Sequence, residues 1–236
     1  MSMRNYYCVI DTETVNGIVT VDGKLDLSQS ICYDIGWTIC DKKGNIYFTR
    51  SYVVAETFYD YKDLMTSGYY VNKLEQYYQD ITNGKREVRT IKEIWYNFCM
   101  DCMLYTVKAV MAYNTYFDYR ALNNTLRYHT KSNFRYFIPK KYEIWDIMKM
   151  ISSCIAKRKS YKSFCERNGY MTNHKTPRPQ IKAETVYKYI TPNSENFSES
   201  HTGLEDAIIE TKIFAYCNRQ HKKMTKKLFN DEKKVV

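Results

Sequence analysis

The sequence predicts an α/β protein of one domain, built on a sheet whose strands run in mixed directions. Three strand-like segments joined by turns occupy residues 7–54. Helical and strand-like segments then alternate to about residue 145, and helical patterns fill the chain to residue 219. This order is typical of a mixed sheet covered by helices. With 236 residues and neither an internal repeat nor a linker, the chain can bury one large core.

The first three strands form a meander. A polar connection from Val15 to Ser30, with a turn signal at Asp22-Gly23, separates the first strand from the second. Residues from Ile31 to Cys40 alternate with the two-residue period of a strand. Asp41–Asn45 then predicts a hairpin turn into a third strand, Ile46–Val54.

Residues 55–89 carry the weakest pattern and form a tyrosine-rich insertion with pieces compatible with helix. The rings could stack on the bases of a single-stranded nucleic acid. They could also cover the sheet and partly face solvent, which we favour because the chain has 24 tyrosines. The tyrosines of this segment are Tyr59, Tyr61, Tyr69, Tyr70, Tyr77 and Tyr78.

A capping box at Thr90–Glu93 starts the first clear helix, which continues at helical spacing to about Tyr105. Shorter elements follow. Strands are expected at Val107–Ala112 and Lys141–Trp145, and helices at about Tyr116–Tyr128, Asp146–Ala156, Tyr161–Asn168, Ala183–Tyr189 and Gly203–Arg219. We assign residues 1–218 to the domain and residues 219–236 to a basic C-terminal tail.

Composition excludes several classes of protein. Hydrophobic residues make up 44% of the chain, as in a globular protein, and no run of about 18 apolar residues predicts a membrane span. Asp11 and Glu13 interrupt the segment where a signal peptide needs an apolar core, so we expect a cytoplasmic protein with reduced cysteines. Cys99 and Cys102 form a lone CxxC without a second ligand pair, which argues against zinc.

The formal net charge is +10, which favours a polyanionic partner, nucleic acid before membrane. Part of the excess lies in the tail, at Lys222, Lys223, Lys226 and Lys227. These lysines could follow phosphates, or they could belong to a solvated helix end.

The first strand, Tyr7–Ile10, ends in Asp11-Thr12-Glu13. Side chains alternate along a strand, so Asp11 and Glu13 project to one face and Thr12 to the other. Two adjacent carboxylates repel each other, and a divalent cation such as Mg²⁺ or Mn²⁺ would neutralise them. Taken alone, the triplet also fits a polar strand end before a turn.

A further carboxylate stands at a predicted helix start. If Thr115 is the N-cap, Asp118 occupies the third helical position. The helix dipole favours a carboxylate there even without a function.

The last helix carries an unusual pair at its start. Thr202 and Glu205 fit a capping box, which places His201 just before the cap and Asp206 at the fourth helical position. Side chains at these two positions meet, so an imidazole and a carboxylate there indicate a site; the alternative is a solvated helix start with an incidental histidine. Gly203 allows close backbone approach. Because strand ends and helix starts gather at one edge of an α/β sheet, we expect the candidate carboxylates to converge.

The ordered set resembles the motifs of the DEDD superfamily of 3′→5′ exonucleases, in the DEDDh branch that includes DnaQ-like and ribonuclease T-like enzymes. D-x-E matches Asp11–Glu13, N-x-x-x-F-D matches Asn114–Asp118, and H-x-x-x-x-D matches His201–Asp206. The resemblance extends from Tyr7 to about Cys217. It implies a ribonuclease H-like fold with a five-stranded mixed sheet flanked by helices.

The resemblance also implies hydrolysis of phosphodiester bonds with two divalent cations, Mg²⁺ or Mn²⁺, releasing nucleoside 5′-monophosphates. Asp11, Glu13 and Asp206 would bind one cation, and Asp11 would also bind the second, which Asp118 supports through water. His201 would take the proton of the attacking water, a role that suits a group with a pKa near 6.5.

Substrate contacts are less sharply defined. By the same resemblance, Thr12 and Thr14 would line the pocket of the terminal nucleoside. Phe117 would stand near the last base or in the core, and Asn114 would hold substrate or cap the helix. Asp146, at the end of a short strand, is assigned to structure.

The alternative function is a nucleic-acid-binding or partner-binding module that keeps the fold without the chemistry. The presence of every acidic motif residue favours the enzyme, and the spacing of His201 disfavours an endonuclease or integrase-like member of the wider fold. The expected partner is the 3′ end of a single-stranded nucleic acid, and no motif distinguishes DNA from RNA.

Overall fold

The computed structural model describes residues 5–15, 29–60, 65, 71–133 and 135–229. These residues contain a six-stranded sheet with the strand order β4-β3-β2-β1-β5-β6. Strands β1, β2 and β3 pair antiparallel, whereas β4 is parallel to β3, β5 to β1, and β6 to β5. The strands are β1 (Tyr6–Val15), β2 (Ile31–Asp41), β3 (Ile46–Val54), β4 (Glu87–Arg89), β5 (Val107–Ala112) and β6 (Glu143–Asp146). The predicted α/β fold with a mixed sheet is confirmed.

The expected number of five strands is wrong by one, because β4 adds to the edge of the sheet beside β3. This strand has only three residues, which is too short to produce a recognisable two-residue period. It lies at the end of the tyrosine-rich insertion.

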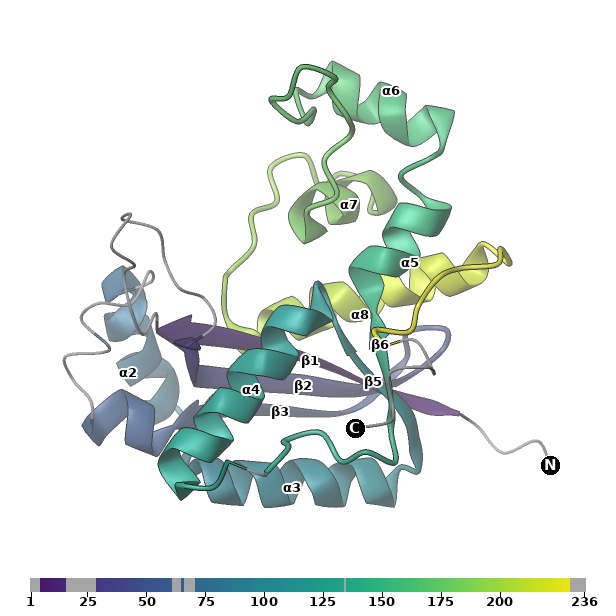
Figure 1. The fold of residues 1–236 in the computed structure, drawn as a ribbon. Helices are drawn as coiled ribbons and strands as arrows, with labels where there is room; N and C mark the ends of the chain where they lie inside the picture. The colour runs from purple at the N-terminus through teal and green to yellow at the C-terminus, as the bar shows by residue number, and fades with distance from the viewer. Residues whose placement is uncertain (1–4, 16–28, 61–64, 66–70, 134, 230–236) are drawn as a thin grey trace.

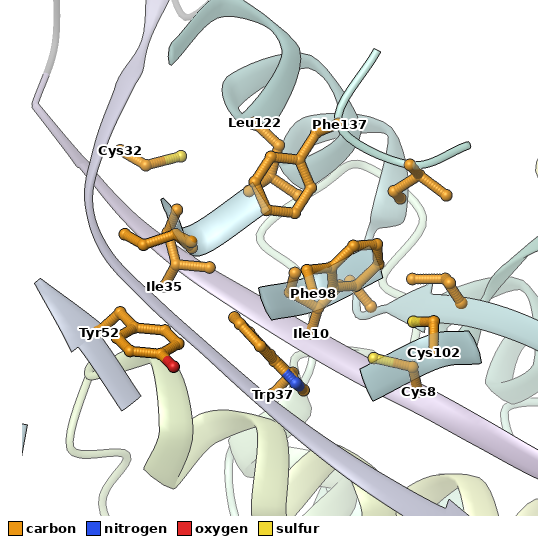
Figure 2. Close-up of a cluster of buried hydrophobic side chains, with 14 of the residues drawn as sticks. Cys8, Ile10, Cys32, Ile35, Trp37, Tyr52, Phe98, Cys102, Leu122 and Phe137 are labelled. Atoms are coloured by element: carbon orange, nitrogen blue, oxygen red, sulfur yellow. The ribbon is translucent and has the colours of Figure 1, made fainter. Parts of the chain in front are cut away.

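Helices cover both faces of the sheet (Figure 1). On one face, α3 (Ile91–Leu104) and α4 (Thr115–Thr130) pack on a core that includes Trp37, Phe98 and Phe137 (Figure 2). A second core lies on the other face. Its helices are α5 (Ile147–Cys154), α6 (Lys159–Arg167), α7 (Ala183–Ile190) and α8 (Gly203–Arg219). No helix in the described part of the chain is both long and apolar enough to span a bilayer.

The tyrosine-rich insertion contains η2 (Glu56–Asp60), η3 (Val71–Lys73) and α2 (Leu74–Thr82) before β4. Tyr77 is buried in a third apolar cluster at the end of β1 and the start of β2, whereas Tyr59 and Tyr78 are exposed. Of the tyrosines that the structure describes in this insertion, Tyr77 therefore covers the sheet, and base stacking by the two exposed rings stays a hypothesis. The predicted connection with its turn at Asp22-Gly23 falls largely outside the described residues, as do Tyr61, Tyr69 and Tyr70.

Local signals placed most element ends correctly. Thr90 and Glu93 form the expected capping box of α3, and Asp146 caps α5 by accepting hydrogen bonds from two backbone amides, at 2.9 and 3.4 Å. Gly44, with φ of +86°, supplies the left-handed residue in the predicted hairpin turn.

The start of α4 differs from the expectation. Asn114 rather than Thr115 is the N-cap, so Asp118 is the fourth helical residue and not the third. The Thr115 hydroxyl is already engaged, because it accepts from the amide of Ala112 at 2.9 Å and lies 2.7 Å from the carbonyl oxygen of Trp145.

The chain after α8 does not continue as a helix, so the lysine run is not a helix end. It returns to β6, where the amide of Leu228 donates to the carbonyl of Ile144 at 2.8 Å. Trp145 and Lys227 form an antiparallel bridge beside this bond. Residues 226–228 of the tail are therefore packed on the sheet edge.

Candidate active site

Strand β1 directs Asp11 and Glu13 toward α8. Its preceding residues alternate between the two cores, with Val9 on the α8 face and Ile10 on the α4 face. The same alternation carries Asp11 and Glu13 to the α8 face and Thr12 to the other, as the sequence predicts.

The first turn of α8 lies directly against the sheet backbone. Gly36 of β2 pairs with Asp11 of β1, and a Cβ on Gly36 would lie 2.1 Å from the amide nitrogen of Leu204. A Cβ on Gly203 would likewise lie 2.7 Å from the nitrogen of Gly36. Both positions therefore require glycine, and their contact brings Asp206 beside the acidic end of β1.

Glu13, His201 and Asp206 form the tightest group of candidate ligands. One ligand atom from each lies within 4.8 Å of the others. Oδ1 of Asp206 is buried and has no hydrogen-bond partner within the described part of the chain. The two carboxylates can bind a divalent cation, and the unpartnered oxygen fits that use.

Asp118 approaches from the opposite face of the sheet. The pairing of β1 with β5 ends at Val9, and the start of α4 lies beyond that point. The hydroxyl of Thr12 donates to Oδ1 of Asp118 at 2.9 Å, and both side chains are buried. Thr12 therefore holds a candidate carboxylate in place.

These side chains line a cavity of about 530 Å³, a volume suited to a small ligand such as a nucleotide. All five motif residues, Asp11, Glu13, Asp118, His201 and Asp206, lie on its wall. Asn114, Phe117 and Thr12 also line it, whereas Thr14 is not among the described lining residues. The structure thus brings together every predicted site residue except Thr14.

Two glutamates of the cavity were not expected from the motifs. Glu210 follows Asp206 by one helical turn on α8 and accepts a hydrogen bond from the amide of Tyr113 at 3.1 Å. Glu199 lies on the loop before His201. The spacing of four residues from Asp206 was the available signal for Glu210, because residues i and i+4 share a helix face.

We call this cavity the acidic cavity. Five of its carboxylates are those of Asp11, Glu13, Asp118, Asp206 and Glu210. Burial is the main influence on their pKa values. Burial, followed by repulsion from the other four carboxylates, raises the pKa of Asp11 well above its ordinary value. Burial and the charge of Glu199 raise the pKa of Asp206 to about 7. Ionising all five groups together is therefore costly unless a cation binds.

Lys73 is a positive group close to this cavity. Its ammonium donates to the carbonyl of Ser200, and its charge opposes the rise in the pKa of Glu13 and Asp206. Burial and Lys73 together lower the pKa of His201 below its ordinary value. This lowering favours the neutral imidazole, which is the form able to accept a proton.

A left-handed residue precedes each of the two helices that carry motif aspartates. Asn114, before α4, has φ of +60°, and His201, at the entry to α8, has φ of +50°. This conformation is uncommon outside glycine, although Asn and His adopt it more readily than most residues. The sharp turn lets the residue before each helix and the aspartate in its first turns face the same cavity.

A second cluster of charged groups, the Arg86 network, lies behind the start of α8. It consists of Asp34, Tyr77, Asp80, Arg86 and Glu205. Asp34 accepts from the amide of Gly203 at 3.0 Å, the hydroxyl of Tyr77 at 2.6 Å and the guanidinium of Arg86 at 3.2 Å. Arg86 also pairs with Glu205 at 2.9 Å and Asp80 at 3.0 Å.

The predicted capping box at α8 is therefore wrong, although Thr202 is the N-cap. The hydroxyl of Thr202 donates to Glu205 at 2.7 Å instead of accepting from the helix. Asp34 of β2 takes over as acceptor for the helix end. No sequence signal reveals this network, because Asp34, Arg86 and Glu205 are far apart in the chain.

Comparison with known proteins agrees with this geometry at the level of fold. No family model matches the sequence, and no curated protein is significantly similar to it. The fold resembles the nuclease domain of 3′hExo, a DEDDh family member solved with rAMP, at 12% identity and a TM-score of 0.55 over 96% of this chain and 99% of that chain.

Two further structures share the fold. A full-length 3′-exonuclease has 15% identity and a TM-score of 0.58, over 93% of this chain and 84% of its own. The zinc-bound E. coli ExoI–ssDNA complex has 13% identity and a TM-score of 0.54, over 92% of this chain. The chain spans only 41% of that E. coli protein. The chain thus has the ribonuclease H-like fold of the DEDDh 3′-exonucleases.

Proposed function

We propose that the protein is a metal-dependent 3′→5′ exonuclease that removes nucleoside 5′-monophosphates from the 3′ ends of single-stranded DNA or RNA. The observation that carries the proposal is the convergence of Glu13, His201 and Asp206 within 4.8 Å. Asp11 and Asp118 line the same cavity. The fold neighbours include a 3′-exonuclease and a protein solved with single-stranded DNA, which supports the proposed substrate class.

Asp11, Glu13 and Asp206 are the proposed ligands of one divalent cation, Mg²⁺ or Mn²⁺, with Asp11 and Asp118 available to a second. Such ions supply an acidified water and stabilise charge on the departing oxygen when they are bound. The donor set suits them, because hard cations prefer carboxylate oxygens. The repulsion within the acidic cavity supports this assignment.

His201 is the proposed general base. It accepts a proton from the water that attacks phosphorus, and the bond from phosphorus to the 3′-oxygen of the preceding nucleotide breaks. That oxygen takes up a proton, which leaves a new 3′-hydroxyl and a nucleoside 5′-monophosphate. The lowered pKa of His201 keeps its ring unprotonated, as this role requires.

Asn114 and Phe117, at the open start of α4, are the proposed contacts of the terminal nucleotide. We assign residues 1–218 to the catalytic domain and residues 219–236 to a tail. A cytoplasmic location is part of the proposal, in keeping with eight cysteines that all lack a disulfide.

The test is digestion of oligonucleotides labelled at the 3′ or the 5′ end, with Mg²⁺ or Mn²⁺, as matched DNA and RNA. The wild type should release the 3′ label first, as a mononucleotide. Asp206→Asn should be inactive, whereas Glu166→Gln, a charge-matched change at an exposed position on α6, should remain active. Intact oligonucleotide with the wild type, or equal digestion by Asp206→Asn, would overturn the assignment. Binding without product would instead support the binding module.

A further inference from the structure

A second cavity, of about 780 Å³, lies beside α4, outside the acidic cavity. One wall is a face of α4, and the opposite wall comes from residues 136–144 and from the tail at Lys227 and Phe229. In Figure 1, α4 crosses the sheet near β6, to which the segment after α8 returns. We call this cavity the α4 groove.

The charge of the α4 groove is opposite to that of the acidic cavity. Four of its described lining residues are cationic. Glu143 is the one acidic residue among all the described lining residues. Oε2 of Glu143 already accepts a hydrogen bond from the indole nitrogen of Trp145 at 2.9 Å. The cationic residues are Arg120, Arg127, Lys140 and Lys227.

Three of these cations are not used by the fold as ion pairs. Within the described part of the chain, no salt bridge involves Arg120, Arg127 or Lys140. By contrast, buried Arg86 pairs with three carboxylates. Cations gathered in one groove without carboxylate partners favour a polyanionic ligand.

Aromatic rings lie beside these cations in the groove. The guanidinium of Arg120 lies 5.5 Å from the ring centroid of Tyr116, and that of Arg127 lies 4.8 Å from the ring of Tyr136. Tyr116 is 51% exposed and Tyr136 is 41% exposed, so both rings are accessible. Rings beside cations are what a single strand requires, because bases stack on the rings while phosphates meet the charges.

Helical geometry connects the groove to the acidic cavity. Tyr116, Arg120, Asn123 and Arg127 follow one another at intervals of four, three and four residues, so they share one face of α4. That face is about 17 Å long at 1.5 Å per residue. Its first member stands next to Phe117, which lines the acidic cavity.

We propose that the α4 groove binds the single-stranded nucleic acid upstream of its 3′ end. The proposal rests on the proposed exonuclease function, since it places the rest of the strand whose terminus occupies the acidic cavity. Phosphates contact Arg120 and Arg127, and a base stacks on Tyr136. The packed tail contributes Lys227 to the same surface.

The first test measures binding rather than cleavage. Fluorescein-labelled 20-mers of thymidine and uridine are titrated with the full chain in EDTA, where the metal-free acidic cavity repels phosphate. The double variant Arg120→Gln/Arg127→Gln should bind at least 10-fold more weakly. The slope of log K against log salt should fall by about 1.4, because each phosphate contact on a single strand contributes about 0.7.

The matched control is Lys42→Gln/Lys43→Gln, which removes two charges from the exposed turn between β2 and β3. It should bind like the wild type. Tyr136→Ala should weaken binding by about 5- to 100-fold without changing the salt slope, because stacking carries no charge. Equal binding by the groove variant and the Lys42/Lys43 control would overturn the proposal, as would a lack of binding by the wild type.

Cleavage distinguishes this proposal from the proposed function. With Mn²⁺, the Arg120/Arg127 variant should have a raised KM for the 20-mer and an unchanged rate on a dinucleotide, which is too short to occupy the groove. If the wild type cleaves no substrate, yet the double substitution weakens binding of the 20-mer in EDTA, the exonuclease assignment fails and the groove assignment is retained. If the wild type cleaves normally and the Arg120/Arg127 variant binds the 20-mer as tightly as the wild type, only the groove assignment fails.

Discussion

Two clusters of carboxylates lie on either side of the start of α8, and their charges are balanced in different ways. In the Arg86 network, a fully buried guanidinium pairs with three carboxylates. In the acidic cavity, the five carboxylates named above share the wall with Glu199. The cations near them are Lys182, which also lines the cavity, and Lys73, which donates to a backbone carbonyl. The first cluster has its cationic partner within the protein, and the second is the proposed site of a divalent cation.

Glu205 and Asp206 show the contrast within two consecutive residues. Hydrogen bonds from Lys85 and Thr202, with the charge of Arg86, lower the pKa of Glu205 to about 2 despite its burial. Burial raises the pKa of Asp206 to about 7. A carboxylate that the fold neutralises is structural, and one that the fold leaves unneutralised is available for chemistry.

The largest expected effect is on turnover. Asp11→Asn should lower the cleavage rate by at least about 1000-fold, since losing a carboxylate that would serve both cations removes several kcal/mol of stabilisation. Folding should be little affected, because the change relieves repulsion. Single-turnover cleavage and circular dichroism measure the two effects. Substantial residual activity would argue against the two-cation assignment.

The Arg86 network should respond in the opposite way. Arg86→Met should destabilise the fold by about 3–5 kcal/mol, because Asp34 and Glu205 lose their buried partner. Urea denaturation measures the loss. The double variant Asp34→Asn/Arg86→Met should recover part of the stability. If Arg86→Met unfolds at the wild-type urea concentration, the network does not secure α8.

Metal should stabilise the protein through the acidic cavity. At about 100 times its dissociation constant, Mn²⁺ should add about 2.7 kcal/mol, or roughly 5–10 °C in Tm for a chain of this size. Differential scanning calorimetry with and without EDTA checks this. Asp206→Asn should reduce the shift, and Arg86→Met should retain it. An unchanged Tm for the wild type would contradict a metal site.

A further effect is expected on the pH dependence of the metal-free protein. Asp206 has a raised pKa in the folded state, so between about pH 4 and 7 the folded form binds more protons than the unfolded form. Stability should therefore fall as pH rises, by up to about 1.4 kcal/mol per pH unit from this group.

The contribution of Glu205 to stability changes with pH in the opposite direction. Because its pKa is about 2 in the folded state, the ionised Glu205 contributes its full stabilisation above its ordinary pKa of 4.5. That stabilisation is lost as the pH falls toward 2. Urea denaturation in EDTA across this range separates the two residues. Asp206→Asn should flatten the decline above pH 4, and Glu205→Gln should leave that decline in place. A decline unaltered by Asp206→Asn would place its origin elsewhere.

Most of the fold and the motif residues could be predicted from local patterns. The alternation in β1, the hairpin turn at Gly44 and the capping box at Thr90 are interactions between residues close in sequence, so short segments reveal them. The ordered spacing of the acidic motifs likewise places Glu13 and Asp206 in one cavity.

The remaining features depend on residues that are distant in the chain. Asp34, not Glu205, accepts from the end of α8, because Gly36 and Gly203 bring the helix onto β2. The short strand β4 gains its pairing only from β3. The α4 groove likewise exists because the tail returns to β6.

Residue type and local spacing are thus sufficient to predict that Asp11, Glu13, Asp118 and Asp206 line one cavity, because strand and helix periods determine where each side chain points. Which carboxylates are neutralised, and by what, was decided by contacts such as Arg86 with Asp34, across 52 positions of sequence. Burial and the charges nearby set a pKa, and both arise only when distant segments pack together.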